Sequence, residues 1–93
     1  MTTKIDFKTL KAGKVIPDVW VVTCGTIKHE TQFKKLSEFI YDTRDGNGWG
    51  MASHLDSFFT SELEALEAAR DYRLKALDEI NERINKLQSQ TND

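Results

Sequence analysis

One uninterrupted helical segment near the C-terminus limits most strongly what this chain can fold into. From Phe58 to Asp93 the sequence contains neither glycine nor proline, the two residues least compatible with a helix interior. Ser61 and Glu64 have the spacing of a capping box, with Thr60 as a rival cap, and acidic residues fill the first turn, where the helix dipole favours them. These signals predict one helix from about residue 62 to about residue 88, within a helical segment 60–89 and before a disordered tail at 90–93.

The length of this helix raises the question of what it packs against. At about 1.5 Å per residue it would be about 40 Å long, which exceeds the diameter expected of the remaining residues, about 60 in number. Either part of the helix projects beyond its own domain or the helix breaks. The apolar residues near its end follow the 3-4-3 spacing of a coiled-coil seam: Leu77, Ile80, Ile84 and Leu87.

The seam predicts a homodimer formed by the distal half of the helix, and the alternative is a helix folded back on its own domain. Extending the seam towards the N-terminus places Arg70 and Arg73 on it, so the coiled-coil pattern fails in the middle of the helix. In that region a different apolar stripe, suited to packing on a sheet, runs through Leu66, Ala69, Tyr72 and Ala76.

The first 59 residues read mainly as β-structure. Runs rich in β-branched and aromatic residues occupy residues 18–24, 26–36, 38–43 and 49–55, separated by glycine-containing turns. In the second run, Ile27, His29, Thr31 and Phe33 alternate with polar residues, which predicts that these four share one face of a strand. We therefore expect a single α+β domain over residues 1–93: a small antiparallel sheet or open barrel of three to five strands, followed by one long C-terminal helix.

The stretch "RDGNGWGM" at residues 44–51 is the most conspicuous candidate site. Its glycines lack the spacing of a dinucleotide fingerprint, no Gly-Lys-Ser/Thr follows, and a calcium-loop alignment offers only Asp45 and Asn47 as reasonable ligands. Asp-Gly and Asn-Gly are instead preferred dipeptides of type I′ hairpin turns. We interpret the stretch as a hairpin turn in which Asp45, Asn47 and Trp49 form a partner-binding loop, with a phosphate or metal contact as the alternatives and Trp49 placed either in the core or at an interface.

No constellation of residues predicts catalysis, a cofactor or a metal site. His29 and His54 are the only histidines, and ligand spacing is absent around them. Cys24 lies next to Gly25 at the end of an apolar run, where a thiol behaves as a small hydrophobe, and Trp20 in the same run is expected in the core. Phe39 and Tyr41, two residues apart, fit a stacking platform for bases or one buried face of a sheet. We expect a protein that is not an enzyme.

Composition narrows the classes of partner. The 93 residues carry a formal net charge of −2, which argues against a dedicated nucleic-acid binder because such a protein normally has a basic face. The single cysteine excludes an intrachain disulfide. Neither a signal-peptide pattern nor an apolar run of membrane-spanning length is present. From the sequence we expect a soluble, cytoplasmic protein without a membrane partner.

The order of the motifs resembles a known group of proteins. The stretch "VWVVTCGTI", the run "EFIY", a glycine turn and then "FFTSELEALEAA" resemble short, mostly uncharacterised bacteriophage and prophage proteins. The resemblance covers about residues 19–69 and implies a small, strongly twisted antiparallel sheet or open barrel backed by a helix. It implies no functional residue.

Three functions remain as hypotheses. The first is a non-enzymatic, phage-encoded interaction protein. It binds a host protein and modulates the activity of that protein by inhibiting it. The second is a nucleotide-binding module in which Arg70 or Arg73 contacts the anion. The third is binding of single-stranded nucleic acid, which the acidic balance disfavours.

Overall fold

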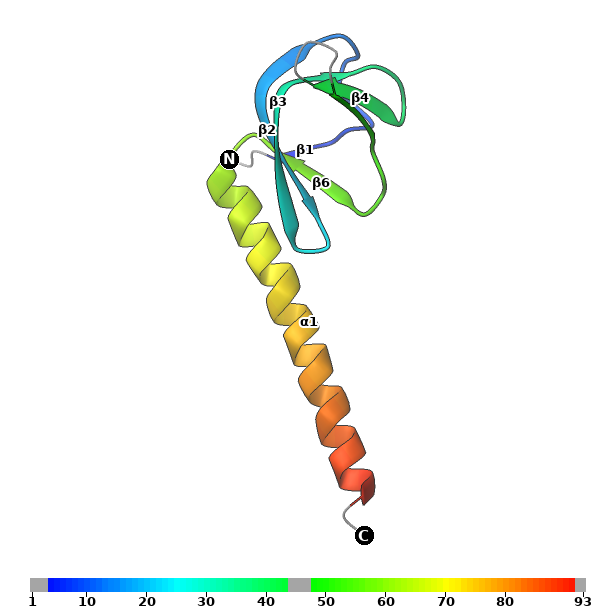
Figure 1. The fold of residues 1–93 in the computed structure, drawn as a ribbon, viewed down its shortest axis with the longest axis vertical. Helices are drawn as coiled ribbons and strands as arrows, with labels where there is room; N and C mark the ends of the chain where they lie inside the picture. Colours follow the sequence, from blue (N-terminus) through cyan, green and yellow to red (C-terminus); the bar gives the residue numbers. More distant parts are fainter. Residues whose placement is uncertain (1–3, 44–47, 92–93) are drawn as a thin grey trace.

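The protein consists of a curled antiparallel sheet and one long helix (Figure 1). The structure, a computed structural model, describes residues 4–43 and 48–91. The strands are β1 (Lys4–Ile5), β2 (Val15–Thr23), β3 (Thr26–Lys35), β4 (Ile40–Thr43), β5 (Gly48–Met51) and β6 (Asp56–Phe59), and the helix is α1 (Glu62–Thr91). Their order in the sheet is β1-β6-β2-β3-β4-β5, so β1 and β5 are the edge strands.

The α+β class and the antiparallel sheet are confirmed, but the expected number of three to five strands is wrong because the described sheet has six. The two unexpected strands are those without a local signal. β1 is only two residues long, and β6 is four residues long and ends with the apolar pair Phe58-Phe59, shortly before the helix cap. Both become strands through pairing with distant residues: Lys4 lies opposite Phe59, and Val21 lies opposite Phe58.

Both faces of the central strands are covered, which explains their continuous apolar runs. One hydrophobic cluster lies inside the curl of the sheet and contains Phe7, Val19, Val21, Phe33, Tyr41 and Phe58. The second cluster lies between the sheet and α1 and contains Val22, Phe59, Ala65 and Ala69. Neighbouring residues of one strand therefore belong to different clusters, because successive side chains of a strand point to opposite faces of the sheet.

The expected alternation along β3 holds only in part. Glu30 pairs with Val19 on the inner face of the sheet, yet Phe33 also belongs to the inner cluster, three residues later. Gln32 between them has a positive φ of 53°. The register of β2 and β3 skips Gln32 together with Pro17, which has no N–H for the ladder. This distortion shifts the alternation by one residue. Ile27, His29 and Thr31 therefore do not share a face with Phe33.

A buried lysine holds the N-terminal segment against the curled sheet by hydrogen bonds. Lys35 is 7% exposed, and its Nζ donates hydrogen bonds to the carbonyl oxygens of Phe7 at 2.8 Å and Lys8 at 3.2 Å. The same ammonium lies 5.0 Å from the centre of the Phe7 ring. These contacts hold Phe7 over the inner cluster, where its ring stacks on Phe58 with centroids 5.2 Å apart.

The helix begins where the sequence predicts, since Ser61 Oγ accepts a hydrogen bond from the Glu64 N–H at 3.4 Å. It continues to Thr91, so residues 90 and 91 belong to the helix rather than to the expected tail. Two alanines, Ala65 and Ala69, make the close contact with the sheet. The expected sheet-facing stripe is therefore only partly right, because Leu66 and Tyr72 are about half exposed.

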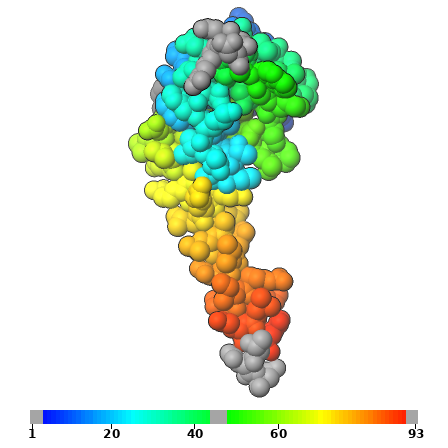
Figure 2. Space-filling view, in the orientation of Figure 1, coloured from blue at the N-terminus to red at the C-terminus, as the bar shows by residue number. Residues whose placement is uncertain are grey.

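The remainder of α1 leaves the sheet as a projecting stem, the orange and red part of the chain in Figure 2. The molecule measures 62 × 25 × 23 Å along its principal axes. Every residue from Leu77 to Gln90 is exposed. The helix therefore does not break, and part of it projects beyond its own domain, which is the first of the two alternatives raised by its length.

Candidate functional site

The β4–β5 hairpin presents an exposed apolar surface at one edge of the sheet. Trp49 is 71% exposed and Met51 is 66% exposed, and both lie on the outer face of β5. Ile40 stands directly opposite Met51 and is 36% exposed. We call these three residues the hairpin patch. The exposure of Trp49 rules out its placement in the core, and its placement at an interface stays a prediction.

The glycines of the same stretch have a packing role that turn chemistry does not explain. A Cβ on Gly50 would lie 2.6 Å from the ring of Tyr41, the residue opposite it on β4. A Cβ on Gly48 would lie 2.7 Å from Oγ1 of Thr43, which itself donates a hydrogen bond to the Gly48 carbonyl. Gly48 and Gly50 are thus strand residues that admit two side chains of β4. Asp45 and Asn47 lie outside the described residues.

The inner side of the hairpin holds a small charged hollow. A cavity of about 320 Å³ is lined in part by Lys28, Glu30, Tyr41 and Gly48. Lys28 Nζ lies 3.0 Å from Glu30 Oε1, and this carboxylate raises the pKa of Lys28 through hydrogen bonding and charge. Burial, reinforced by the charge of Glu30, raises the pKa of Tyr41. Tyr41 is therefore a buried neutral phenol.

This burial decides between the two interpretations of Phe39 and Tyr41. Tyr41 is 7% exposed and belongs to the inner cluster, whereas Phe39 is 60% exposed. The two rings therefore do not form a shared exposed platform on which bases could stack.

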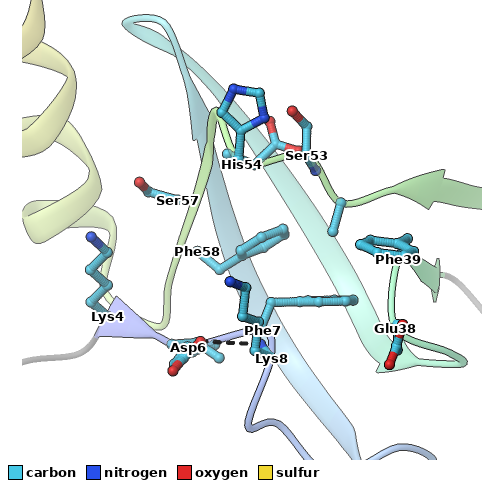
Figure 3. Close-up of a pocket in the computed structure, with 13 residues that line it drawn as sticks. Lys4, Asp6, Phe7, Lys8, Glu38, Phe39, Ser53, His54, Ser57 and Phe58 are labelled. Atoms are coloured by element: carbon cyan, nitrogen blue, oxygen red, sulfur yellow. Dashed lines mark hydrogen bonds between the residues drawn. The ribbon is translucent and has the colours of Figure 1, made fainter.

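A wider groove opens between the N-terminal strand and the turn that follows β5 (Figure 3). Its volume is about 880 Å³, and Phe7 and Phe58 form its aromatic floor. Phe39 and His54 border it on one side, and Lys4, Asp6 and Lys8 on the other. Asp56 shapes the turn beside it, because Asp56 Oδ2 accepts a hydrogen bond from the Ser53 N–H at 2.8 Å. The rim carries both signs of charge and so favours no particular ionic ligand.

The distal helix carries the second exposed apolar surface. Leu77, Ile80, Ile84 and Leu87 are each between 46% and 56% exposed. Half exposure is expected of a side chain that lies along a helix with nothing packed over it. We call these four residues the distal seam.

The two arginines that interrupt the seam have structural partners. Arg73 Nε donates a hydrogen bond to the carbonyl of Gly25 at 2.9 Å, which ties α1 to the end of the β2–β3 hairpin. Arg70 reaches its neighbour Asp71, with 3.1 Å between Nη2 and Oδ1. The sequence pattern missed the contact of Arg73 because Gly25 is 48 residues away.

Cys24 is placed differently from the expectation. It is exposed at the tip of the β2–β3 hairpin, and its φ of 49° together with the 83° of Gly25 is typical of a type I′ turn. The contact of its thiol with Tyr72 raises the pKa of that phenol, first through a hydrogen bond. Cys24 is therefore a turn residue rather than a buried strand residue.

The histidines occupy separate surroundings. The ring of His29 lies parallel to the half-buried ring of Trp20, with centroids 4.6 Å apart, and its Nε2 lies 2.9 Å from Asp18 Oδ1. His54 borders the groove.

Among residues 4–43 and 48–91, no three His, Cys, Asp or Glu side chains gather closely enough to hold a metal ion. Within the same ranges, no helix has the length and apolar character needed to cross a membrane.

Comparisons with protein-family models, with curated proteins and with solved structures gave no match to this chain. The resemblance to bacteriophage and prophage proteins stays a prediction from the sequence motifs.

Proposed function

We propose that this chain is a non-enzymatic interaction protein that forms a homodimer through the distal seam and binds another protein with its sheet domain. The observation that carries the proposal is the projecting half of α1, which presents four apolar residues at coiled-coil spacing, all of them about half exposed. The hairpin patch is the protein-binding surface, since exposed tryptophan and methionine are enriched at interfaces. The bound protein is a host protein under the hypothesis of phage origin.

The exposed area of the distal seam sets the strength of the dimer. Complete burial of a Leu or Ile side chain contributes about 1.5–3 kcal/mol, so burial of the exposed half contributes about 0.75–1.5 kcal/mol. Four residues from each of two chains give about 6–12 kcal/mol, and association costs at least about 4 kcal/mol. The net of about 2–8 kcal/mol corresponds to dissociation constants from tens of millimolar to about micromolar, and the proposed dimer requires the tighter part of this range, between about micromolar and about millimolar.

The flanking residues favour a parallel arrangement of the two helices. With Leu77 and Ile84 at the first core position of each heptad, Arg83 occupies a flanking position. In a parallel dimer Arg83 lies beside the partner's Gln88. In the antiparallel dimer that keeps all four seam residues paired, the two copies of Arg83 lie side by side and repel each other. The parallel dimer also places both sheet domains at the same end.

Sedimentation equilibrium tests the dimer. The mass should rise from 10.7 kDa for one chain towards twice that value as the concentration increases from about 10 µM to about 1 mM. Ile80→Asp combined with Ile84→Asp should remain monomeric, whereas the matched control Asp78→Ala on the opposite side of the helix should not change the mass. A wild-type chain that stays monomeric over the whole range contradicts the proposal.

A cysteine at residue 87 distinguishes the orientations. In a parallel dimer Leu87 lies opposite its own copy, so Leu87→Cys in a Cys24→Ser background should form an intermolecular disulfide in air. Glu82→Cys on the outer side of the helix is the control and should not cross-link. Equal cross-linking of both variants contradicts the parallel arrangement.

A further inference from the structure

The free edge of β5 carries an inference about how a partner is bound. Within the described residues β5 is the last strand of the sheet and pairs only with β4. The Ala52 N–H donates a hydrogen bond to the Phe39 carbonyl at 2.6 Å. In an antiparallel pair, successive residues turn their backbone groups alternately towards and away from the neighbouring strand. Gly50 and Gly48 therefore face β4, whereas the N–H and C=O groups of Trp49 and Met51 point to the free edge.

Natural edge strands are protected from strand addition by being very short, by lysine, proline or a bulge, or by a covering element. β5 has only four residues, but among the described residues its edge lacks the other protections. Gly48–Met51 contains neither lysine nor proline, and all four residues pair in regular register with β4. Its two side chains with a Cβ, Trp49 and Met51, are both exposed and apolar. An exposed, regular, apolar edge of this kind is a template for another strand.

The surroundings of the edge define the chemistry of the occupant. An added strand would carry alternate side chains on the outer face, where they meet Trp49 and Met51. The side chains between them would lie on the inner face, beside the glycines and the hollow lined by Lys28 and Glu30. An extended segment with apolar residues at alternate positions and polar residues between them satisfies both faces.

We propose that β5 binds an extended segment of a partner protein as a seventh strand of the sheet, held by the backbone groups of Trp49 and Met51. This inference deepens the proposed function, because it names the binding mode of the sheet domain, and it rests on the proposal that this domain binds a protein. It does not require the dimer, since the distal seam lies on the projecting end of α1.

A proline at residue 51 tests the role of the backbone. Met51→Pro removes an N–H that points to the free edge and leaves the bonds to β4 intact, and proline is tolerated at such edge positions. Met51→Ala removes the same side chain and keeps the N–H, so it is the matched control. The probe is a displayed library of linear peptides of about ten residues, long enough to pair along the whole of β5. Peptides selected on the wild-type chain should bind Met51→Pro at least about tenfold more weakly than Met51→Ala.

Amide hydrogen exchange of the wild-type chain supplies a second readout that does not depend on the folding of a variant. A selected peptide should slow the exchange of the Trp49 and Met51 amides, while the Gly50 amide, already turned towards β4, should change less. Three results overturn the inference: selection enriches no peptide, the selected peptides bind both variants equally, or the two edge amides are not slowed.

The dimer is tested separately by the same peptides. Their affinity for the Ile80→Asp/Ile84→Asp variant should equal that for the wild-type chain. If the Ile80→Asp/Ile84→Asp variant is monomeric and still binds the peptides with the affinity of the wild-type chain, the dimer and the strand-addition site are independent. If the wild-type chain is monomeric yet binds the peptide with protected edge amides, only the dimer proposal fails.

Discussion

Replacement of Gly50 by alanine tests the packing of the hairpin most directly. The new methyl group would lie 2.6 Å from Tyr41, which is 0.8 Å short of the 3.4 Å at which ordinary contact begins. The Tyr41 ring has little room to withdraw, because it stacks on Phe33 with centroids 4.8 Å apart and meets Phe58 edge to face. Overpacking of this kind costs about 1–3 kcal/mol.

An opposing effect reduces this cost. Alanine restricts the unfolded chain more than glycine does, which stabilises the fold by about 0.5–1 kcal/mol. With the middle of each range, the net change expected for Gly50→Ala is a loss of about 1.25 kcal/mol in the free energy of unfolding. With a urea dependence of about 1 kcal/mol per molar, expected of so small a chain, the midpoint should fall by about 1.25 M.

A double-mutant cycle identifies the cause of the loss. In a Tyr41→Leu background the ring is absent, so Gly50→Ala should become neutral or stabilising, although Tyr41→Leu is itself destabilising. Urea unfolding followed by far-ultraviolet circular dichroism measures all four chains. A Gly50→Ala chain as stable as the wild type refutes the reasoning, as does an equal loss in both backgrounds.

Three further predictions concern other buried or strained positions. Lys35→Met should lower the free energy of unfolding by about 2–3 kcal/mol, because it removes charge-assisted hydrogen bonds to two carbonyls, including that of Phe7. Proteolysis near the N-terminus should become faster, and an unchanged urea midpoint would contradict the prediction. Cys24→Asn creates an Asn-Gly turn where φ is 49° and should stabilise by about 0.5–1 kcal/mol, visible as a higher melting temperature. Because burial raises the Tyr41 pKa above its usual 10.0, its stabilising contribution is complete below about pH 10 and is lost as pH rises through the raised pKa. Tyr41→Phe should therefore lose less stability than the wild type in alkaline unfolding experiments.

The features predicted from the sequence are those set by local chemistry. The helix cap at Ser61 and the long uninterrupted helix follow from residues that are neighbours in the chain, and the structure agrees with both, although α1 continues to Thr91, beyond its expected end near residue 88. The α+β class follows from local periodicity in the same way. The exposed position of the distal seam follows from length, since the helix exceeds the domain on which it packs.

Only the tertiary structure decided which distant residues meet. β1 and β6 have no strong signal of their own and form through a pairing that joins Lys4 to Phe59. The role of Gly50 depends on the ring of Tyr41 across the strand, and that of Arg73 depends on the carbonyl of Gly25. In the part of the chain that the structure describes, the free edge of β5 likewise exists because the sheet ends there. Local propensity cannot encode such contacts, because each depends on how the whole chain closes.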